Sequence, residues 1–371
     1  MAAPCGNAGG RMTRREFVSA SAALAAVGAS AADAESRDAP ELAAAKKWFR
    51  EAQFGMMAHW GLYSLLAGEW RGRRCGAYSE WIEWTRRIPS GEYAALASAF
   101  NPLFFDPKDW MKRARDAGMR YFVFTAKHHD GFAMYRSKVS RFNVVDATPF
   151  GRDVVEELAD ACRDAGLRFG LYYSQDVDWS EPNGGGLFRR HHIKSEPRVW
   201  GNDWDFGHVK KEDYRFEEYL EAKSVPQVTE LLTQYGDLCL VWFDVPVTCT
   251  PEQSRRFRDL VRRHQPGCLI NGRIGNGLGD YVTPTDNALA TDTRPDRLYE
   301  MVGTMNGSWG YHPTDTRYRT VDEIAALREK CRSIGSNYML NIGPDHLGRI
   351  PAPGVAILEG LAASKGGSRP S

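Results

Sequence analysis

The chain has 371 residues, of which 43% are hydrophobic, enough to build a sizeable core. Its 48 Lys and Arg and 47 Asp and Glu leave a formal net charge of +1, which argues against a nucleic-acid groove or a membrane-surface patch. The seven cysteines show no CxxC or metal-ligand spacing, so neither a disulfide framework nor a zinc site is indicated.

The N-terminal segment has the features of an export signal. Residues 13–18 read TRREFV and precede an Ala-rich stretch, and Ala-x-Ala sites follow at 29–31 and 32–34. We therefore predict a twin-arginine signal over 1–34, a linker over 35–47 and a periplasmic or extracellular protein; the alternative is a leader without meaning. No run of about 20 strongly apolar residues follows, so no transmembrane helix is expected.

From about Trp48 the sequence alternates between strand-like and helix-like segments. Strands are expected at 54–60, 121–126, 168–174, 239–243, 269–271 and 338–343, with weaker candidates at 287–291 and 298–302. Helices are expected at 90–100, 106–117, 153–165, 213–235, 251–264, 321–333 and 351–361. Several of these helix patterns stop at a glycine, a favoured residue just past a helix end, as at Gly118, Gly166 and Gly236.

The number of strands approaches eight, with helices returning between them. This count favours a (β/α)8 TIM-like barrel, an α/β fold, as a single domain over 48–362, followed by a disordered tail over 363–371. The alternative is an open doubly wound sheet, but no nucleotide-binding loop opens an early helix. Insertions at 68–89 and 180–212 follow strand ends and are lid candidates.

Ionisable residues follow three of the predicted strands. The run 121–126 leads into Lys127, His128, His129 and Asp130, the run 168–174 leads into Asp176, and the run 239–243 ends at Asp244. Because catalytic groups of a parallel barrel gather at the C-terminal ends of the strands, we predict one shared site there. Three unrelated solvated loops are the alternative interpretation.

Nine short motifs lie in order along residues 59–344. They are HWGLYS (59–64), SEW (79–81), FNP (100–102), TAKHHDGF (125–132), GLYYS (170–174), WFD (242–244), NGR (271–273), SWGY (308–311) and LNIGP (340–344). In this combination the chain resembles glycoside hydrolase family 29, the retaining α-L-fucosidases, over about 48–361. The resemblance implies a hydrolase without a cofactor that acts on fucosylated oligosaccharides or glycoconjugates. Many family members continue into a C-terminal β-sandwich, so a catalytic domain alone is expected here.

The resemblance assigns Asp244 as the catalytic nucleophile. A retaining glycosidase forms a covalent glycosyl-enzyme on one carboxylate and uses a second group, roughly 5 to 5.5 Å away, as acid and then base. Arg273 is expected to stabilise the ionised Asp244. A purely structural ion pair between the two is the alternative.

The acid/base residue departs from the family pattern. Family members often carry a glutamate after a loop resembling 280–284, but here that position is Thr285, which cannot protonate a leaving group usefully. Glu300 and Asp286 are equal candidates, ahead of Glu80.

The resemblance also implies a sugar pocket made of polar and aromatic side chains. Imidazoles and a carboxylate can hydrogen-bond sugar hydroxyls, while Trp faces can pack on the methyl group and the apolar side of the ring. The expected members are His59, Glu80, Trp81, His128, His129, Tyr173, Trp242, Arg273 and Trp309.

Two patterns suggest other ligands but do not predict them. His128 and His129 are adjacent, and neighbours on a strand point to opposite faces, so no metal site is expected. The glycine-rich segment 275–279 lacks the Lys-Ser/Thr of a P-loop, which favours a turn at the barrel rim over a phosphate site.

These observations predict an exported retaining α-L-fucosidase that releases terminal fucose from glycans. The alternatives are a fucose-binding protein that lost its acid/base at Thr285, and a related glycosidase acting on a sugar of similar hydroxyl pattern. Neither nucleic acid nor membrane is expected as a partner.

Overall fold

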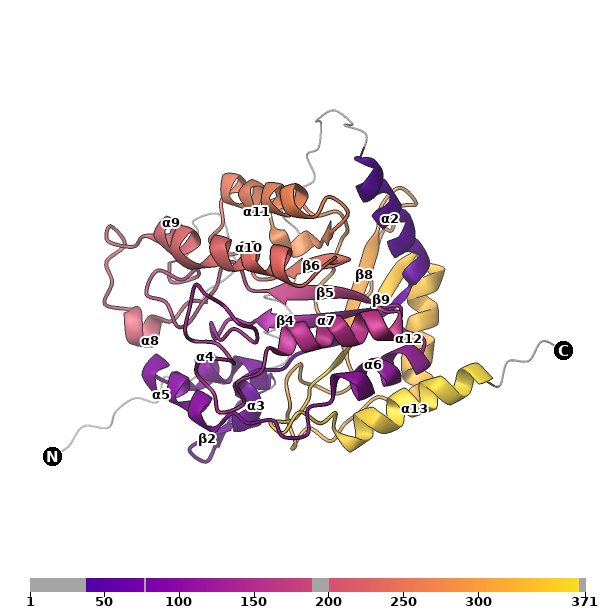
Figure 1. Cartoon of the computed structure of the whole chain (residues 1–371), viewed down its shortest axis with the longest axis horizontal. Helices are drawn as coiled ribbons and strands as arrows, with labels where there is room; N and C mark the ends of the chain where they lie inside the picture. The colour runs from indigo at the N-terminus through magenta and orange to yellow at the C-terminus, as the bar shows by residue number, and fades with distance from the viewer. Residues whose placement is uncertain (1–37, 77, 189–199, 367–371) are drawn as a thin grey trace.

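Parallel strands form the centre of the computed structural model, which describes residues 38–76, 78–188 and 200–366 (Figure 1). Seven of them make one sheet in the order β7-β6-β5-β4-β1-β9-β8. Their bounds are β1 (Phe54–Ala58), β4 (Tyr121–Lys127), β5 (Arg168–Tyr173), β6 (Leu240–Phe243), β7 (Leu269–Ile270), β8 (Tyr299–Thr304) and β9 (Ser336–Ile342). Because β1 pairs with both β4 and β9, the first and last parts of the chain meet inside this sheet.

A short segment closes the sheet into a ring. Parallel bridges join Asn271 to Tyr281 and Val282 to Tyr299, so residues 281–282 lie between β7 and β8. The backbone N–H of Val282 donates to Leu298 at 2.8 Å, as expected for a strand. With this segment as the eighth member, the predicted (β/α)8 TIM-like barrel is confirmed.

The weak strand candidate at 287–291 is wrong. These residues form turns and irregular backbone, and the place of the missing strand is taken by 281–282, which the sequence analysis assigned to a loop. Two residues are too few to show a periodic pattern, which explains why this strand was missed.

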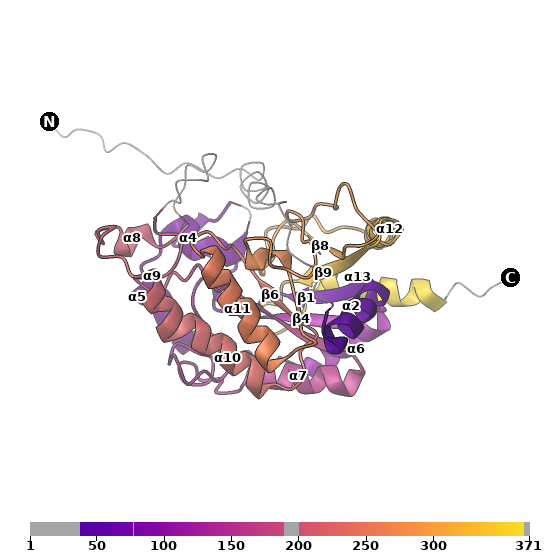
Figure 2. The same cartoon turned by 90° about the horizontal axis from the view of Figure 1, so that it is seen from above.

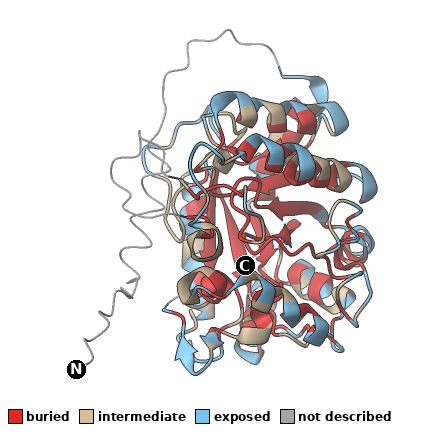
Figure 3. Cartoon of the chain, turned by 90° about the vertical axis from the view of Figure 1, so that its left-hand side faces the viewer, coloured by how far each residue is buried: buried red, intermediate tan, exposed pale blue. Residues whose placement is uncertain are grey.

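Seven longer helices surround or cap the barrel. They are α2 (Pro40–Ala52), α6 (Pro107–Asp116), α7 (Val154–Ala165), α10 (Val225–Gln234), α11 (Pro251–His264), α12 (Val321–Ser333) and α13 (Ala352–Gly366). Side-chain caps fix several helix starts: Asp106 and Asp153 accept from first-turn N–H groups, and Thr250 and Thr320 form capping boxes. In Figure 3 the inner helix faces are buried and the outer faces exposed.

Shorter elements occupy the connections. They are α3 (Tyr63–Leu66), β2 (Glu69–Trp70), β3 (Arg73–Arg74), η1 (Ser79–Trp81), α4 (Ile82–Arg86), α5 (Ser90–Ala95), η2 (Leu96–Ala99), α8 (Asp203–Phe206), α9 (Phe216–Tyr219), the π-helical η3 (Leu220–Ser224) and η4 (Gly272–Ile274). Both predicted insertions contribute to this set. They also meet each other, since the ring centroids of Trp200 and Trp81 are 5.3 Å apart. The helices α4 and α8 of the two insertions are neighbours in Figure 2.

Helix α2 corrects the predicted domain boundary. The predicted linker over 35–47 is wrong for residues 40–47, because residues 40–52 form a helix that buries Leu42, Ala45 and Phe49. Phe49 packs on Tyr281 with ring centroids 4.7 Å apart. The apolar spacing of these residues, together with Pro40 in the first turn, is a helix signal that the analysis missed.

The two ends of the chain are only partly described. The predicted export signal at 1–34 lies outside the described residues. At the other end α13 continues to Gly366, so the predicted tail is wrong for residues 363–366, and residues 367–371 are not described. Among the helices of the described ranges, none is long and apolar enough to cross a membrane.

Strand side chains alternate between the barrel interior and the layer beneath the helices. The interior cluster includes Met57, Val123, Tyr172, Trp242 and Met339. Their neighbours Met56, Phe124, Tyr173, Phe243 and Leu340 belong to the outer cluster. This alternation decides which side chains can reach a site at the strand ends.

Candidate active site

Asp244 directly follows β6, at the C-terminal end of the barrel. Its Oδ1 accepts from Arg273 Nη1 at 3.0 Å and its Oδ2 accepts from the Tyr172 hydroxyl at 2.9 Å. The Asp244 side chain remains 12% exposed, so it is both tightly held and reachable. The next residue, Val245, has φ of 48°, a strained conformation for a β-branched residue, and turns the chain sharply away.

Arg273, on η4, joins Asp244 to a second carboxylate. Its Nη2 donates to Asp286 Oδ1 at 2.5 Å and to the Pro284 carbonyl at 3.1 Å. Its guanidinium lies 4.7 Å from the centroid of the Trp242 ring. Burial alone would lower the pKa of Arg273, but the two carboxylates outweigh burial and raise it. One cation therefore holds both carboxylates within the span of a single guanidinium.

Glu300 lies deeper in the barrel. It is the second residue of β8 and pairs with Asn337 near the start of β9. Its carboxylate accepts from the Tyr121 hydroxyl at 2.7 Å and from Trp242 Nε1 at 3.0 Å. It is fully buried, and burial raises its pKa to about 7. Trp242 thus contacts Glu300 through its edge and Arg273 through its face.

Three histidines gather above the Asp244 side of the barrel. His128 and His129 lie 4.3 Å apart between ring centroids, and His59 lies 5.6 Å from His128. His128 also stacks on Tyr172 at 5.4 Å. The expectation that His128 and His129 point to opposite faces is wrong, because β4 ends at Lys127 and the strand alternation ends with it.

A metal has no evident place among these groups. The described residues contain no group of three or more His, Cys, Asp or Glu side chains that could hold a metal ion.

The glycine-rich segment 275–279 forms a turn, with φ of 89° at Gly275 and 72° at Gly277.

The first insertion and the loop after β8 supply the remaining wall. Glu80 Oε2 accepts from the Gly310 N–H at 2.8 Å, and burial raises the pKa of Glu80 to about 8. The Trp81 ring lies 4.9 Å from His129, and Trp309 lies 5.1 Å from His59. The structure therefore brings the predicted members from both ends of the chain to one place.

Tyr173 is the predicted pocket member that lies elsewhere. It faces the outer layer, where its hydroxyl donates to Gln227 Oε1 at 2.8 Å and Lys127 Nζ lies 4.7 Å from its ring centroid. Its neighbour Tyr172 points inward and contacts Asp244 instead. Tyr172 is not among the residues predicted for the pocket, although the alternation of side chains along β5 is a signal that points to it.

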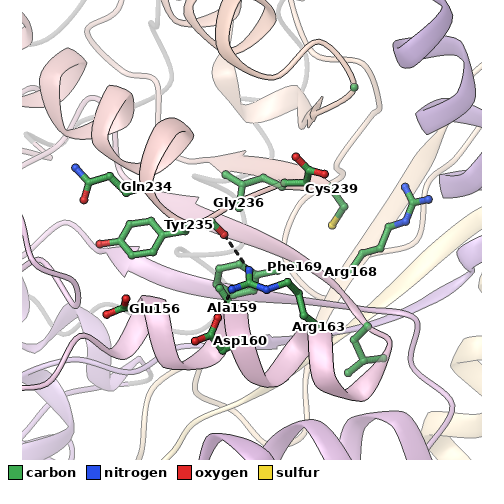
Figure 4. A pocket seen from close by; sticks show the side chains of 14 residues that line it. Glu156, Ala159, Asp160, Arg163, Arg168, Phe169, Gln234, Tyr235, Gly236 and Cys239 are labelled. Carbon is green, nitrogen blue, oxygen red and sulfur yellow. Dashed lines mark hydrogen bonds and ion pairs between the residues drawn. The ribbon is translucent and has the colours of Figure 1, made fainter.

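A separate pocket of about 730 Å³ lies at the other end of the barrel (Figure 4). Its lining includes Arg168 and Phe169 at the start of β5, and Cys239 just before β6. Arg163 crosses it to donate to the Tyr235 carbonyl at 3.3 Å. Because these residues belong to the N-terminal ends of the strands, the pocket is distinct from the site around Asp244.

Comparisons with known proteins agree with one another. The alpha-L-fucosidase family model matches residues 20–363. The tissue alpha-L-fucosidase of Mus musculus is 32% identical over 324 residues, covering 82% of this chain and 66% of its own length. That of Homo sapiens is 30% identical and is covered to 64%. The chain thus spans just under two thirds of the length of these curated relatives.

Solved structures give fuller coverage. Unliganded alpha-L-fucosidase AlfC from Lactobacillus casei is 47% identical with a TM-score of 0.81, covering 87% of this chain and 98% of that one. The alpha-L-fucosidase from Vibrio sp. strain EJY3 is 38% identical with a TM-score of 0.78, covering 87% of this chain and 55% of that one.

Proposed function

Because the chain belongs to the alpha-L-fucosidase family, we propose that it is a retaining α-L-fucosidase that releases terminal α-L-fucose from glycans. The observation that carries this proposal is the pair of carboxylates, Asp244 and Asp286, held by the single guanidinium of Arg273. Two carboxyl groups at short separation are what a retaining glycosidase requires.

Asp244 is the proposed nucleophile. One of its oxygens forms a bond to the anomeric carbon of fucose while the bond from that carbon to the leaving oxygen breaks. The contacts from Arg273 and Tyr172 stabilise the ionised carboxylate and fix its orientation, so little reorganisation is needed in the transition state.

Asp286 is the proposed acid/base, and the geometry favours it over Glu300. Asp286 shares Arg273 with the nucleophile, and its side chain is 12% exposed. Glu300 is fully buried, and its carboxylate accepts from Tyr121 and from the edge of Trp242. Glu80 is also buried, with one oxygen committed to Gly310.

The reaction of a retaining glycosidase starts with the nucleophile Asp244 ionised and the acid/base Asp286 protonated. Asp286 gives that proton to the leaving oxygen in the first step. In the second step it takes a proton from water, whose oxygen attacks the anomeric carbon and releases Asp244 with net retention.

The surrounding side chains suit a deoxy sugar. Imidazoles of His59, His128 and His129 and the carboxyl group of Glu80 can hydrogen-bond ring hydroxyls, and the Trp81 and Trp309 rings offer apolar faces. A structure of the Lactobacillus casei enzyme contains Fucα(1,6)GlcNAc. We propose fucosylated oligosaccharides or glycoconjugates as the substrates of this chain.

Azide rescue with an activated aryl α-L-fucoside tests the two roles. Asp244→Gly should lose turnover and, with azide, should give the β-fucosyl azide. Asp286→Ala should form the fucosyl-enzyme and give the α-fucosyl azide, while the matched variant Glu300→Ala should gain nothing from azide.

If Glu300→Ala gave the α-fucosyl azide and Asp286→Ala did not, Glu300 would be the acid/base and the assignment of Asp286 would be wrong. Wild-type protein that binds fucose without turnover would instead indicate a binding protein, and the proposed activity would be wrong.

We also propose that the protein is exported by the twin-arginine route, based on TRREFV at residues 13–18. Residues 1–34 fused to a folded fluorescent reporter should direct it out of the cytoplasm of a bacterium with this route. Replacing both Arg14 and Arg15 with Lys should retain the reporter inside. Export that survives this double change contradicts the proposal.

A further inference from the structure

Hydrogen bonds determine which ring nitrogen of His129 carries the proton. His129 Nδ1 lies 2.6 Å from Ser174 Oγ, and Ser174 Oγ donates to the Val177 carbonyl at 2.6 Å. A carbonyl can only accept, and a serine hydroxyl has a single hydrogen. Since that hydrogen is used on Val177, Ser174 must accept from His129, and Nδ1 must be the protonated nitrogen.

His59 is fixed in the same way by an amide. Its Nδ1 lies 2.7 Å from Asn341 Oδ1, while Asn341 Nδ2 donates to the Trp309 carbonyl at 2.8 Å. The Trp309 carbonyl requires the NH₂ end of the amide, which places the amide oxygen against His59. An amide oxygen only accepts, so Nδ1 of His59 also carries the hydrogen.

Both rings are held neutral. Burial lowers the pKa of His59 to about 4. Burial, assisted by the charge of Lys127, lowers the pKa of His129 well below its ordinary value. A neutral imidazole with its hydrogen on Nδ1 presents a lone pair at Nε2.

The surroundings of His129 Nε2 leave a hydrogen-bond donor missing. Among the described residues this nitrogen is buried and has no hydrogen-bond partner. It lies 3.7 Å from Asp244 Oδ2, but both atoms are acceptors. A buried acceptor without a donor is costly, so the site is suited to a ligand that brings hydrogens of its own.

We propose that Ser174 and Asn341 are positioning residues that hold His129 and His59 in the Nδ1–H tautomer, so that both rings accept hydrogen bonds from sugar hydroxyls. This inference rests on the proposed function for its ligand. It adds a rule for specificity: at these two places the pocket recognises a hydroxyl as a donor. If fluorine replaces such a hydroxyl, a lone pair of the fluorine faces the lone pair of the histidine Nε2, and the two repel each other. If hydrogen replaces it, Nε2 only lacks a hydrogen-bond donor.

The tautomers can be measured without any substrate. In the free protein labelled with ¹⁵N-histidine, His59 and His129 should each show a protonated Nδ1 and an unprotonated Nε2 in ring ¹⁵N spectra. Ser174→Ala removes the acceptor and should move the hydrogen of His129 to Nε2, towards Asp244. In the control Ser336→Ala, where a buried hydroxyl also donates to a carbonyl, both rings should be unchanged.

Analogues extend the test to the reaction. Aryl α-L-fucosides with fluorine in place of one hydroxyl, at carbon 3 or 4, should have kcat/KM at least tenfold below the matching deoxy compounds at one position or both. Fluorine also slows the reaction by its inductive effect, which is the same in every variant. In Ser174→Ala the difference between the fluoro and deoxy compounds should therefore shrink several-fold relative to wild type where His129 contacts the sugar. Nε2–H or doubly protonated rings in the wild-type spectrum would overturn the proposal, whether or not the protein hydrolyses fucosides. Nδ1–H tautomers of both rings in a protein without turnover would count against the proposed function alone.

Discussion

Replacing Glu300 with Gln should change how the stability of the protein depends on pH. The Glu300 carboxyl group is fully buried against Tyr121 and Trp242, and burial raises its pKa from 4.5 to about 7. Between these values the folded chain holds a proton that the unfolded chain has released. The free energy of unfolding of the wild type therefore falls as the pH rises through this interval.

The size of the effect follows from the same two values. Each pH unit of difference corresponds to about 1.36 kcal/mol, so the contribution of Glu300 to stability decreases by about 3 kcal/mol from below pH 4.5 to above pH 7. Gln fills the same space and offers Trp242 an acceptor, but it does not titrate. The stability of Glu300→Gln relative to wild type should therefore increase with pH.

Urea unfolding of both proteins from pH 5 to pH 8 measures this difference. The free energy of unfolding of Glu300→Gln minus that of wild type should rise by about 2 to 3 kcal/mol across the range. The control is Glu252→Gln, at an exposed position on α11, for which the difference should stay constant. A constant difference for Glu300→Gln would show that burial does not affect the titration of this carboxyl group.

Two further substitutions test how the site is held, and a third tests a buried ion pair in the layer around the barrel. Arg273→Met should lower kcat/KM for an aryl fucoside at least 100-fold, because two carboxylates then share the site without a cation, and wild-type activity would contradict the shared-cation argument. Tyr172→Phe removes a hydrogen bond to the charged Asp244, worth about 1.5 to 3 kcal/mol, so kcat/KM should fall by about 10- to 100-fold. A decrease of less than twofold would mean that this hydrogen bond does not contribute to the reaction. Lys127→Met removes a fully buried ion pair of 2.8 Å with Asp178 and should lower the free energy of unfolding by on the order of 3 kcal/mol in urea, whereas an unchanged value would show that the pair adds nothing.

The sequence predicts the barrel well where its elements are long. The helix that stops at Gly166 shows a helical period, and β4 and β6 are continuous apolar runs, so their places are readable without a structure. The errors fall where a period cannot be established. Residues 281–282 are too short for one. The end of β4 is predicted to within one residue, but His128 and His129, which follow it, are still predicted as neighbours on a strand.

The site was predicted as a set of motifs, but its orientation was not. GLYYS contains two adjacent tyrosines, and only the phase of β5 in the barrel tells that Tyr172 faces inward while Tyr173 faces outward. Likewise, Asp286 and Glu300 are equivalent in the sequence. Their contacts differ only in three dimensions, where Arg273 binds Asp286 and Trp242 binds Glu300.

The NGR motif has a physical reason that the sequence does not reveal. Strand β7 ends at Ile270, so Phe243, the last residue of β6, has a strand partner in β5 but none on the β7 side. The side chain of Asn271 replaces the partner: its Nδ2 donates to the Phe243 carbonyl and its Oδ1 accepts from the Phe243 N–H, both at 2.9 Å. The backbone is thus held up to the residue before Asp244.

The backbone of Asp244 itself is held by another side chain. Its N–H donates to Gln175 Oε1 at 3.0 Å, and the chain then leaves through the positive φ of Val245. Asn271 and Gln175 therefore fix the backbone, while Arg273, two residues after Asn271, fixes the carboxylate. A rigid nucleophile requires both, because an error of about 1 Å in its position costs on the order of 100-fold in rate. Short side chains from neighbouring strand ends can meet that tolerance at the barrel rim, where strand pairing has already ended.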